Sequence, residues 1–310
     1  MYEIFKEFSK FNNIKFYDEP HVYFIDDEQV ISVTGLIHKF ENEFEEEKWL
    51  LIKSEEWLIP GFQQPGETPE AALERAKGIV KAEWTYKNNH GIYEGKLTHF
   101  YLENLMANKD VSEDITGHGV VPFDEIENTY YVIKKHAYSF YRDYIQTGIL
   151  IPVKSELVVG AKELGLAGQI DQLFYNTQLE ALQLYDWKTN RKMGRVSNYS
   201  MIGPLSHLDS CELNTYSLQL YTYKYLIEKN TNIRLHDKLH IVWFNEHNDG
   251  PHIIECRDMT KEVQMMLEFK QANPDMFKVR PYVRPSIPEV IVEKAPSMGD
   301  LLNFSDPFLF

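Results

Sequence analysis

The sequence predicts a mixed α/β or α+β fold built as a single domain, and three observations lead to this prediction. The hydrophobic periodicity changes along the chain from helices to three strands, then to a helix and further strands. Hydrophobic residues make up 43% of the 310 residues and aromatic residues 14%, which is enough material for a packed core. No internal repeat or long low-complexity tract interrupts this order, which argues against a disordered or fibrous protein.

The amino-terminal segment is expected to form a strand pair followed by a helix. Apolar and polar side chains alternate over residues 14–26, IKFYDEPHVYFID, and residues 26–28 fit a turn before the next apolar run. Ser32 and Thr34 can cap a helix that begins near Gly35, because their hydroxyls can accept hydrogen bonds from its first backbone N–H groups.

Helical patterns follow this segment. Residues 41–56 carry seven acids and two lysines, which is typical of a helix with a solvated face. Thr68 and Pro69 fit the N-cap and the first position of another helix. We expect that helix to run to about Lys87 and residues 91–106 to form the next one.

The rest of the chain alternates between strand and helix patterns. The helix expected over residues 211–229 rests on five apolar or aromatic residues spaced three or four apart. In chain order, the pattern predicts a helix at 128–147, strands at 152–160, 165–175 and 181–189, a helix at 211–229, strands at 238–246 and 252–256, and a helix at 260–272.

Charge and cysteine content exclude several classes of protein. The formal net charge of −15 argues against a generic nucleic-acid binder with a basic surface, although DNA binding remains open if positive charge gathers locally. Cys211 and Cys256 are the two cysteines, so a disulfide framework and a four-cysteine zinc or iron–sulfur site are excluded. No apolar run has the length of a signal peptide or of a membrane helix, so we expect a cytoplasmic protein with no membrane partner.

Chemistry-bearing residues gather on two neighbouring strands. Side chains alternate between the faces of a strand, so Asp186 and Lys188 follow Leu182 and Leu184 on one face. An unpaired charge is costly to bury, which makes this pattern unusual for a simple buried strand. The short connection near residues 176–178 suggests a hairpin, which would bring Asp171 close to Asp186.

Two neighbouring carboxylates repel each other unless a cation lies between them. Oxygen ligands of this kind suit Mg²⁺ or Mn²⁺, and Lys188 could orient water or stabilise developing phosphate charge. The alternative interpretation is a structural Asp186–Lys188 ion pair at the edge of a sheet.

Two helices carry further candidates. His99 and Glu103 are four residues apart and therefore lie on one helical face. A single helical histidine is usually structural, but a histidine and a glutamate that must meet two aspartates are a different case. Gln219 and Tyr223 are also four apart, and they could reach a phosphate or a nucleobase or could simply pack in the core.

Five segments in order resemble the PD-(D/E)XK nucleases of the RecB type. They are GKLTHFYLE, SELVV, GQIDQLF, YDWKT and QLYTY, and the resemblance covers roughly residues 90–230. The opening HVYFIDDEQVISVTGLI is similar to the start of phage and mitochondrial single-domain exonucleases of this group. The resemblance implies a restriction-endonuclease-like core, a central mixed sheet flanked by helices, with an N-terminal helical extension. It divides the chain into an N-terminal region (1–89), a nuclease core (90–284) and an extended tail (285–310).

The resemblance also implies a role for each matching residue. His99, Asp171, Asp186 and the main-chain carbonyl of Trp187 would bind the metal, Lys188 would be the catalytic lysine, and Glu156 would support the catalytic metal site. Gln219 and Tyr223 would contact the substrate and order the site, Ser32 and Thr34 would also bind substrate, and Glu103 would be a partner of His99. Two cysteines cannot build the iron–sulfur cluster of some relatives, and no GxxxxGK[ST] motif is present, so no ATP-driven motor is expected.

Other segments suggest contacts with DNA or with a protein. Arg191, Lys192 and Arg195 lie in an acid-free run after the catalytic strand, and they are either phosphate contacts or a solvated loop. Aromatic residues near the His99 helix could stack bases, although most are expected in the core; they are Trp84, Tyr86, Tyr93 and Tyr101. The tail of residues 299–310 could dock on a replication or recombination protein or pack on the chain's own surface.

These observations favour a Mg²⁺- or Mn²⁺-dependent deoxyribonuclease. An exonuclease that acts on DNA ends, single-stranded or in resected duplex, is preferred, with a place in recombination, repair or replication. The alternatives are a structure-specific endonuclease and a non-catalytic DNA- or protein-binding module on the same fold.

Overall fold

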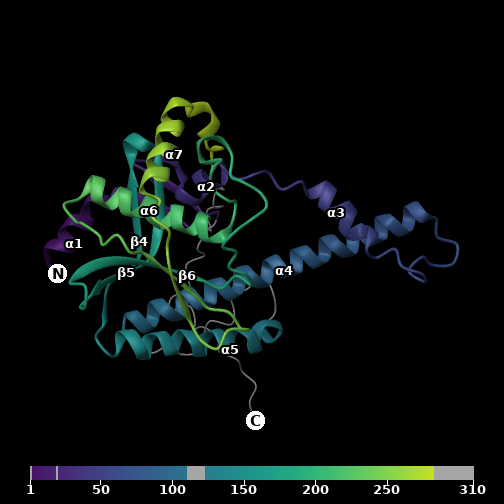
Figure 1. The fold of residues 1–310 in the computed structure, drawn as a ribbon, viewed down its shortest axis with the longest axis horizontal. Helices are drawn as coiled ribbons and strands as arrows, with labels where there is room; N and C mark the ends of the chain where they lie inside the picture. The colour runs from purple at the N-terminus through teal and green to yellow at the C-terminus, as the bar shows by residue number, and fades with distance from the viewer. Residues whose placement is uncertain (1, 19, 110–122, 283–310) are drawn as a thin grey trace, which may run out of the picture. The chain divides into compact units, whose positions relative to one another are not determined.

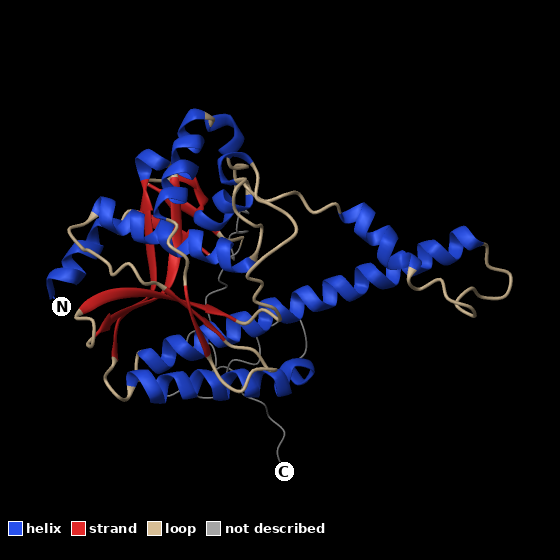
Figure 2. Cartoon of the chain, viewed as in Figure 1, coloured by secondary structure: helices blue, strands red, loops and turns tan. Residues whose placement is uncertain are grey.

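The computed structural model describes residues 2–18, 20–109 and 123–282. Met1–Val279 form one compact unit. The tail predicted at residues 285–310, with its proposed partner contact, lies outside the described residues. Figures 1 and 2 show the order and type of the elements.

The described residues form α-helices, β-strands and short helical turns with the following bounds. The α-helices are α1 (Tyr2–Phe8), α2 (Val33–His38), α3 (Glu46–Glu55), α4 (Pro69–Met106), α5 (Phe123–Phe140), α6 (Glu212–Asn230) and α7 (Thr260–Ala272). The strands are β1 (Ile14–Tyr17), β2 (Val22–Ile25), β3 (Glu28–Ser32), β4 (Leu150–Ala161), β5 (Leu166–Asn176), β6 (Ala181–Lys188), β7 (His240–Trp243) and β8 (His252–Glu255). Short helical turns are η1 (Ser9–Phe11), η2 (Tyr141–Ile145), η3 (Lys162–Leu164), η4 (Gly203–Leu205) and η5 (Pro274–Phe277).

The strands of the described residues form one mixed sheet. Its order is β1-β2-β3-β5-β6-β7-β8, and β4 pairs with the other edge of β5. The β3–β5 and β6–β7 pairs are parallel, and the remaining pairs are antiparallel. Helices flank this sheet, as Figure 2 shows, so the fold class predicted from the sequence is confirmed.

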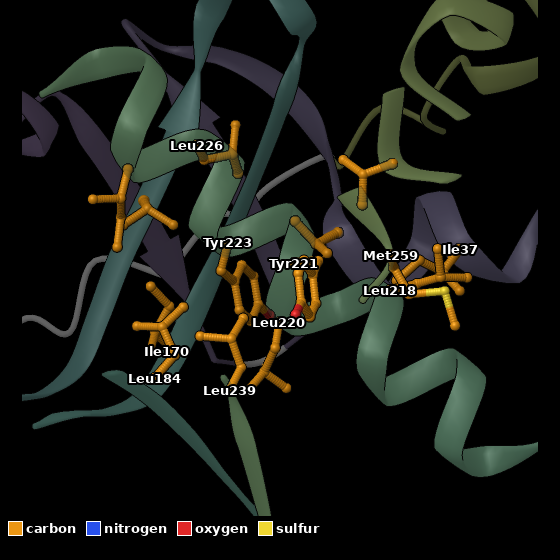
Figure 3. Close-up of a cluster of buried hydrophobic side chains, with 14 of the residues drawn as sticks. Ile37, Ile170, Leu184, Leu218, Leu220, Tyr221, Tyr223, Leu226, Leu239 and Met259 are labelled. Carbon is orange, nitrogen blue, oxygen red and sulfur yellow. The ribbon is translucent and has the colours of Figure 1, made fainter. Parts of the chain in front are cut away.

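Two apolar cores cover the two faces of the sheet. The larger core joins α2, α6 and α7 to one face (Figure 1), and Figure 3 shows α6 side chains such as Leu220 and Tyr223 against Ile170 of β5 and Leu184 of β6. On the other face, α4 and α5 pack against an aromatic cluster; its rings are Phe140, Phe174, Tyr185, Trp187 and Phe244. β6 thus contributes to both cores with alternate residues.

Most of the expected elements are confirmed within a few residues. The predicted hairpin near residues 176–178 forms between β5 and β6, and the side chain of Asn176 accepts hydrogen bonds from the backbone N–H groups of Gln178 and Leu179. The expected strand pair at residues 14–31 is instead three strands. Pro20 and a positive φ of 65° at His21 turn the chain between β1 and β2, so the alternating run folds back on itself.

The two helices predicted at 69–87 and 91–106 are one continuous helix, α4. Thr68 caps it as expected, since its hydroxyl accepts a hydrogen bond from the N–H of Ala71 at 3.2 Å. Gly91 and Gly95 do not end it, because a helical glycine costs only about 1 kcal/mol, which packing can offset. The boundary expected after residue 89 falls inside this helix.

Among the described residues, no helix combines the length and the hydrophobicity that a membrane span requires.

We predict that Phe174→Ala lowers the free energy of unfolding by about 3–5 kcal/mol, because it leaves a cavity where four rings meet. Urea denaturation measures this loss. Leu179→Ala, at a residue that is 45% exposed in the β5–β6 turn, is the control and should change stability by less than about 0.5 kcal/mol. Equal losses in the two variants would contradict a shared aromatic core.

Candidate active site

The candidate site lies where β5 changes its strand partner. On one edge, β3 pairs with β5 up to Ala167, and β6 takes over the same edge from Gln172 onward. Residues 168–171 between these two ladders have no register partner on that edge among the described residues. The ends of β3 and β6 therefore meet an open stretch of β5, and Asp171 is at the end of that stretch.

His99, Glu156 and Asp171 converge at this opening. One ligand atom from each lies within 4.8 Å of the others. His99 Nδ1 is 3.7 Å from Asp171 Oδ1 and 3.8 Å from Glu156 Oε1. Oxygen and imidazole donors in this arrangement fit a divalent cation. These three residues come from α4, β4 and β5, and their role as metal ligands stays a prediction.

Glu156 reaches this cluster with an unusual backbone. The residues on either side of it pair with the residues on either side of Asp171, so Glu156 lies level with Asp171 across the β4–β5 ladder. Its φ is +50°, in the left-handed region that a non-glycine residue rarely adopts and that costs about 1–3 kcal/mol. A strained residue in the middle of a strand places this carboxylate, and such strain is typical of functional sites.

A second carboxylate group adjoins the cluster on β6. The carboxylate of Asp186, 2% exposed, contacts the ammonium of Lys188, as the shared strand face predicts. Gln219 of α6 donates a hydrogen bond to Asp186 Oδ1 at 3.3 Å and also contacts the Tyr223 hydroxyl at 3.2 Å. The N–H of Trp187 donates to Asp171 Oδ2 at 2.7 Å, which links the two aspartates through the backbone of β6.

Gly168 makes room for this α6 contact. A Cβ at residue 168 would lie 2.6 Å from the ring of Tyr223, which is too short for a real side chain, and 3.2 Å from its hydroxyl, which is a tight contact. The glycine therefore lets Tyr223 pack directly on the open stretch of β5. Gly95 has no such role, because a Cβ there would meet only Thr189 at an ordinary 3.7 Å.

The charges of the site shift the pKa values of its members. Burial alone would lower the pKa of His99, but Asp171 and Glu156 outweigh it and raise the pKa to about 9. Burial raises the pKa of Asp186 to about 7, with Lys188 opposing this and Asp171 adding to it. Burial would lower the pKa of Lys188, yet Asp186 and Asp171 outweigh it and raise it. Burial raises the pKa of Tyr223 well above its usual value.

Two cavities open beside the cluster, and His99 lines both. The first, of about 610 Å³, holds Asp171 and Glu156 in its wall together with Ser32, Thr34, Gln219 and Tyr223. The second, of about 750 Å³, is lined by Trp187, Lys188, Tyr216 and Arg191 and by the acids Glu94 and Glu246. Burial and Glu246 raise the pKa of Glu94 to about 7, and Arg191 opposes them.

The remaining predicted residues differ in how close they come to the cluster. Ser32 caps α2 by accepting a hydrogen bond from the N–H of Gly35, while Thr34 lies inside the first turn, so the helix begins two residues earlier than expected. Glu103 is exposed on the wall of the first cavity, and the ion-pair partners of His99 among the described residues are Glu156 and Asp171 instead. The expected contact between Glu103 and His99 is therefore not present.

The three basic residues of the acid-free run after β6 also differ in their distance from the site. All three residues are exposed; Arg191 lines the second cavity, whereas Lys192 and Arg195 are in neither cavity wall. The side chain of Trp187 packs in the aromatic core. The role of its main-chain carbonyl as a metal ligand stays a prediction.

Sequence reasoning missed Tyr216. The Lys188 ammonium lies 4.8 Å from the centre of the Tyr216 ring, a cation–π contact that holds the lysine from the side of α6. Tyr216 is three residues before Gln219, so the helical period that pairs Gln219 with Tyr223 also indicates that Tyr216 shares their face.

Comparisons with known proteins give little beyond this geometry. No model of a known protein family matches the chain, and no curated protein matches its sequence. A structure from Eubacterium rectale, named provisionally as an exonuclease, is 15% identical over 84% of this chain and 97% of that chain, with a TM-score of 0.32. The structure of a protein named SSO0001 is 13% identical over 61% of this chain and 90% of that chain, with a TM-score of 0.23. The assignment of a function therefore rests on the site itself.

We predict that the metal-free protein loses stability as the pH rises from 6 to 9. The folded-state pKa values of Asp186 and His99, about 7 and about 9, lie above their ordinary values of 3.8 and 6.5. The folded protein therefore binds these protons more tightly, and their stabilisation is present at lower pH and lost as the pH passes through about 7 and then about 9.

Urea unfolding in EDTA at pH 6, 7.5 and 9 measures this loss. Asp186→Asn should remove the part around pH 7, and His99→Gln the part between pH 7.5 and 9. If neither substitution changed how the free energy of unfolding depends on pH, the raised pKa values of Asp186 and His99 would be refuted.

Proposed function

We propose that this protein is a metal-dependent deoxyribonuclease that hydrolyses phosphodiester bonds, and that it acts as an exonuclease at DNA ends. The observation that carries the proposal is the meeting of His99, Glu156 and Asp171 with the Asp186–Lys188 pair at the open stretch of β5. Carboxylates, an imidazole and a lysine beside one another are the groups that metal-assisted phosphate hydrolysis needs. The ordered resemblance to RecB-type PD-(D/E)XK nucleases supports the same assignment.

In this proposal His99, Asp171, Asp186 and the Trp187 carbonyl would hold Mg²⁺ or Mn²⁺. Glu156, whose carboxylate lies in one cluster with His99 and Asp171, would support the site. Such an ion, when bound, lowers the pKa of a bound water and neutralises charge on a phosphate. Mn²⁺ accepts imidazole more readily than Mg²⁺ does, and carboxylates suit both ions.

The side chains of the protein itself have three tasks in this proposal. Lys188 keeps its positive charge beside the scissile phosphate, because Asp186 and Asp171 raise the pKa of its ammonium. Gln219 holds Asp186 in place through its amide and is in turn contacted by Tyr223. Arg191 in the second cavity supplies a phosphate contact on the side of Lys188.

Two alternative functions would use the same fold. A structure-specific endonuclease would use the same chemistry within a strand, and a binding module would keep the fold without cleavage. The exonuclease is preferred because the sequence contains no evident sequence-reading module and its opening resembles that of single-domain exonucleases. A role in recombination, repair or replication, and a partner for residues 285–310, stay predictions.

We predict that Asp186→Asn and Lys188→Ala each lower the cleavage rate of end-labelled linear DNA in Mg²⁺ or Mn²⁺ by about 100-fold or more. The reason is that metal binding and charge stabilisation dominate this chemistry. Matched controls are Asp143→Asn and Lys229→Ala, whose side chains lie outside both cavities. Wild-type rates in the two site variants, measured on folded and nuclease-free preparations, would refute the proposed function.

Closed circular single-stranded DNA separates the alternatives in the same assay. An exonuclease leaves the circle intact and degrades the linear strand, an endonuclease opens the circle, and a binding module changes neither substrate. Labels at the 5′ and 3′ ends of the linear strand then give the polarity.

We predict that Arg191→Ala flattens the salt dependence of DNA binding by up to about 0.7–0.9 in the slope of log affinity against log salt, the value for one phosphate contact. Arg195→Ala should change the slope less, because Arg195 lies outside both cavity walls. Arg142→Ala, at an arginine paired with Asp143, is the control. Identical slopes in wild type and Arg191→Ala would place the second cavity away from the DNA backbone.

A further inference from the structure

The first cavity combines the metal-binding cluster with a wall of aromatic rings. Its lining includes His99 and Asp171 at the cluster and four rings from two separate parts of the chain; these are Phe16, His21, Tyr23 and Phe100. Three of the rings come from the β1–β2 hairpin, and Phe100 comes from α4 directly after His99. The rings and the cluster thus share one cavity.

The hairpin rings form a packed group. Phe16 and Tyr23 stack with their centres 4.7 Å apart and their planes 23° apart. His21 lies edge-on to both of them, at 5.0 Å from Phe16 and 5.6 Å from Tyr23. The positive φ of His21 turns its side chain onto this pair, so the hairpin presents a fixed aromatic surface to the cavity.

Phe100 is an exposed ring of the set, as is His21, whereas Tyr23 is buried. Phe100 is 45% exposed and has no aromatic partner within the described part of the chain. Two of the aromatic residues that the sequence suggested for base stacking, Tyr93 and Tyr101, are instead 3% and 6% exposed in the core. An accessible ring one residue from a proposed metal ligand is suited to stack on a flat ligand group.

The polar groups of the same cavity complement these rings. Ser32 and Thr34 carry hydroxyls, Gln169 carries an amide, and these groups can hydrogen-bond the edge of a base or a sugar. Charged side chains line both cavities: Asp18, Lys96 and Glu103 are in the wall of the first, and the second has Lys87, Lys188 and Arg191 together with the acids Glu83, Glu94 and Glu246. The aromatic rings of the hairpin and Phe100 line the first cavity. The 610 Å³ of the first cavity is within the 300–1,000 Å³ range of sites for small organic ligands.

We propose that the first cavity binds the nucleobase next to the scissile phosphate, stacked on Phe100 and facing the Phe16–His21–Tyr23 wall. This inference rests on the proposed function, since a phosphate at the His99–Asp171 cluster carries its own nucleoside into the adjoining cavity. Stacking accepts every base, so the cavity recognises a base as such and does not read sequence.

Binding of two single strands tests the inference. The probes are fluorescein-labelled (dT)12 and an equally long strand of abasic tetrahydrofuran units, measured by anisotropy in Mg²⁺ with Asp186→Asn as the background so that the strands stay intact. We expect the background protein to bind (dT)12 at least about 5-fold more tightly than the abasic strand, the effect of one base–aromatic stack.

Three further substitutions in that background assign the preference to its residue. Phe100→Leu keeps an apolar side chain without a ring and should bring the affinity ratio close to 1, and Phe100→Trp should keep it. Phe5→Leu, at a phenylalanine that is also 45% exposed and lies on α1, is the matched control and should keep the ratio as well. Both sites, residues 100 and 5, are exposed, so the variants should fold.

A ratio near 1 in the background protein, or a ratio that survives Phe100→Leu, would overturn the nucleobase site. The proposed function is judged separately, by cleavage of (dT)12 by the wild-type protein in Mg²⁺ or Mn²⁺. Cleavage without a base preference refutes the nucleobase site alone. A base preference that Phe100→Leu removes, in a protein that does not cleave, supports the nucleobase site and refutes the nuclease.

Discussion

The candidate site depends on one constraint, the change of partner along the edge of β5. If the β5–β6 ladder continued beyond the Gln172–Tyr185 pair, Trp187 would lie opposite the main chain of β5. Instead the buried N–H of Trp187 donates to the carboxylate of Asp171, so the end of the ladder both satisfies a main-chain donor and orients an acidic side chain. The opening left by the two ladders is where the other charged groups of the site meet.

β6 couples this opening to both cores. Asp186 and Lys188 occupy one face of the strand, while Tyr185 and Trp187 occupy the other and pack among the rings under α4 and α5. Because alternate side chains of a strand point to opposite faces, the aromatic packing that fixes β6 also fixes the positions of the acid and the lysine. On the site face, α6 supplies the amide of Gln219 that holds Asp186.

The parts of the site that follow from local periodicity could be predicted from the sequence. The shared face of Asp186 and Lys188 needs only the two-residue period of a strand, and the approach of Asp171 needs only a short hairpin. The strained backbone of Glu156 could not be predicted, since it arises from the long β4–β5 register. The continuity of α4 was also beyond reach, because tertiary packing outweighs the low helix propensity of its glycines.

The charge balance of the site sets a condition on the proposed function of a protein with a net charge of −15. Once Asp186 is ionised, above its pKa of about 7, the carboxylates of Glu156, Asp171 and Asp186 outnumber the two cationic groups beside them, Lys188 and the protonated His99. Without a further cation, the excess negative charge of this cluster repels a phosphate, and its carboxylates also repel one another. If the site binds a divalent ion, that ion therefore controls whether DNA can approach at all, and the metal dependence should be seen in substrate binding as well as in the rate of cleavage.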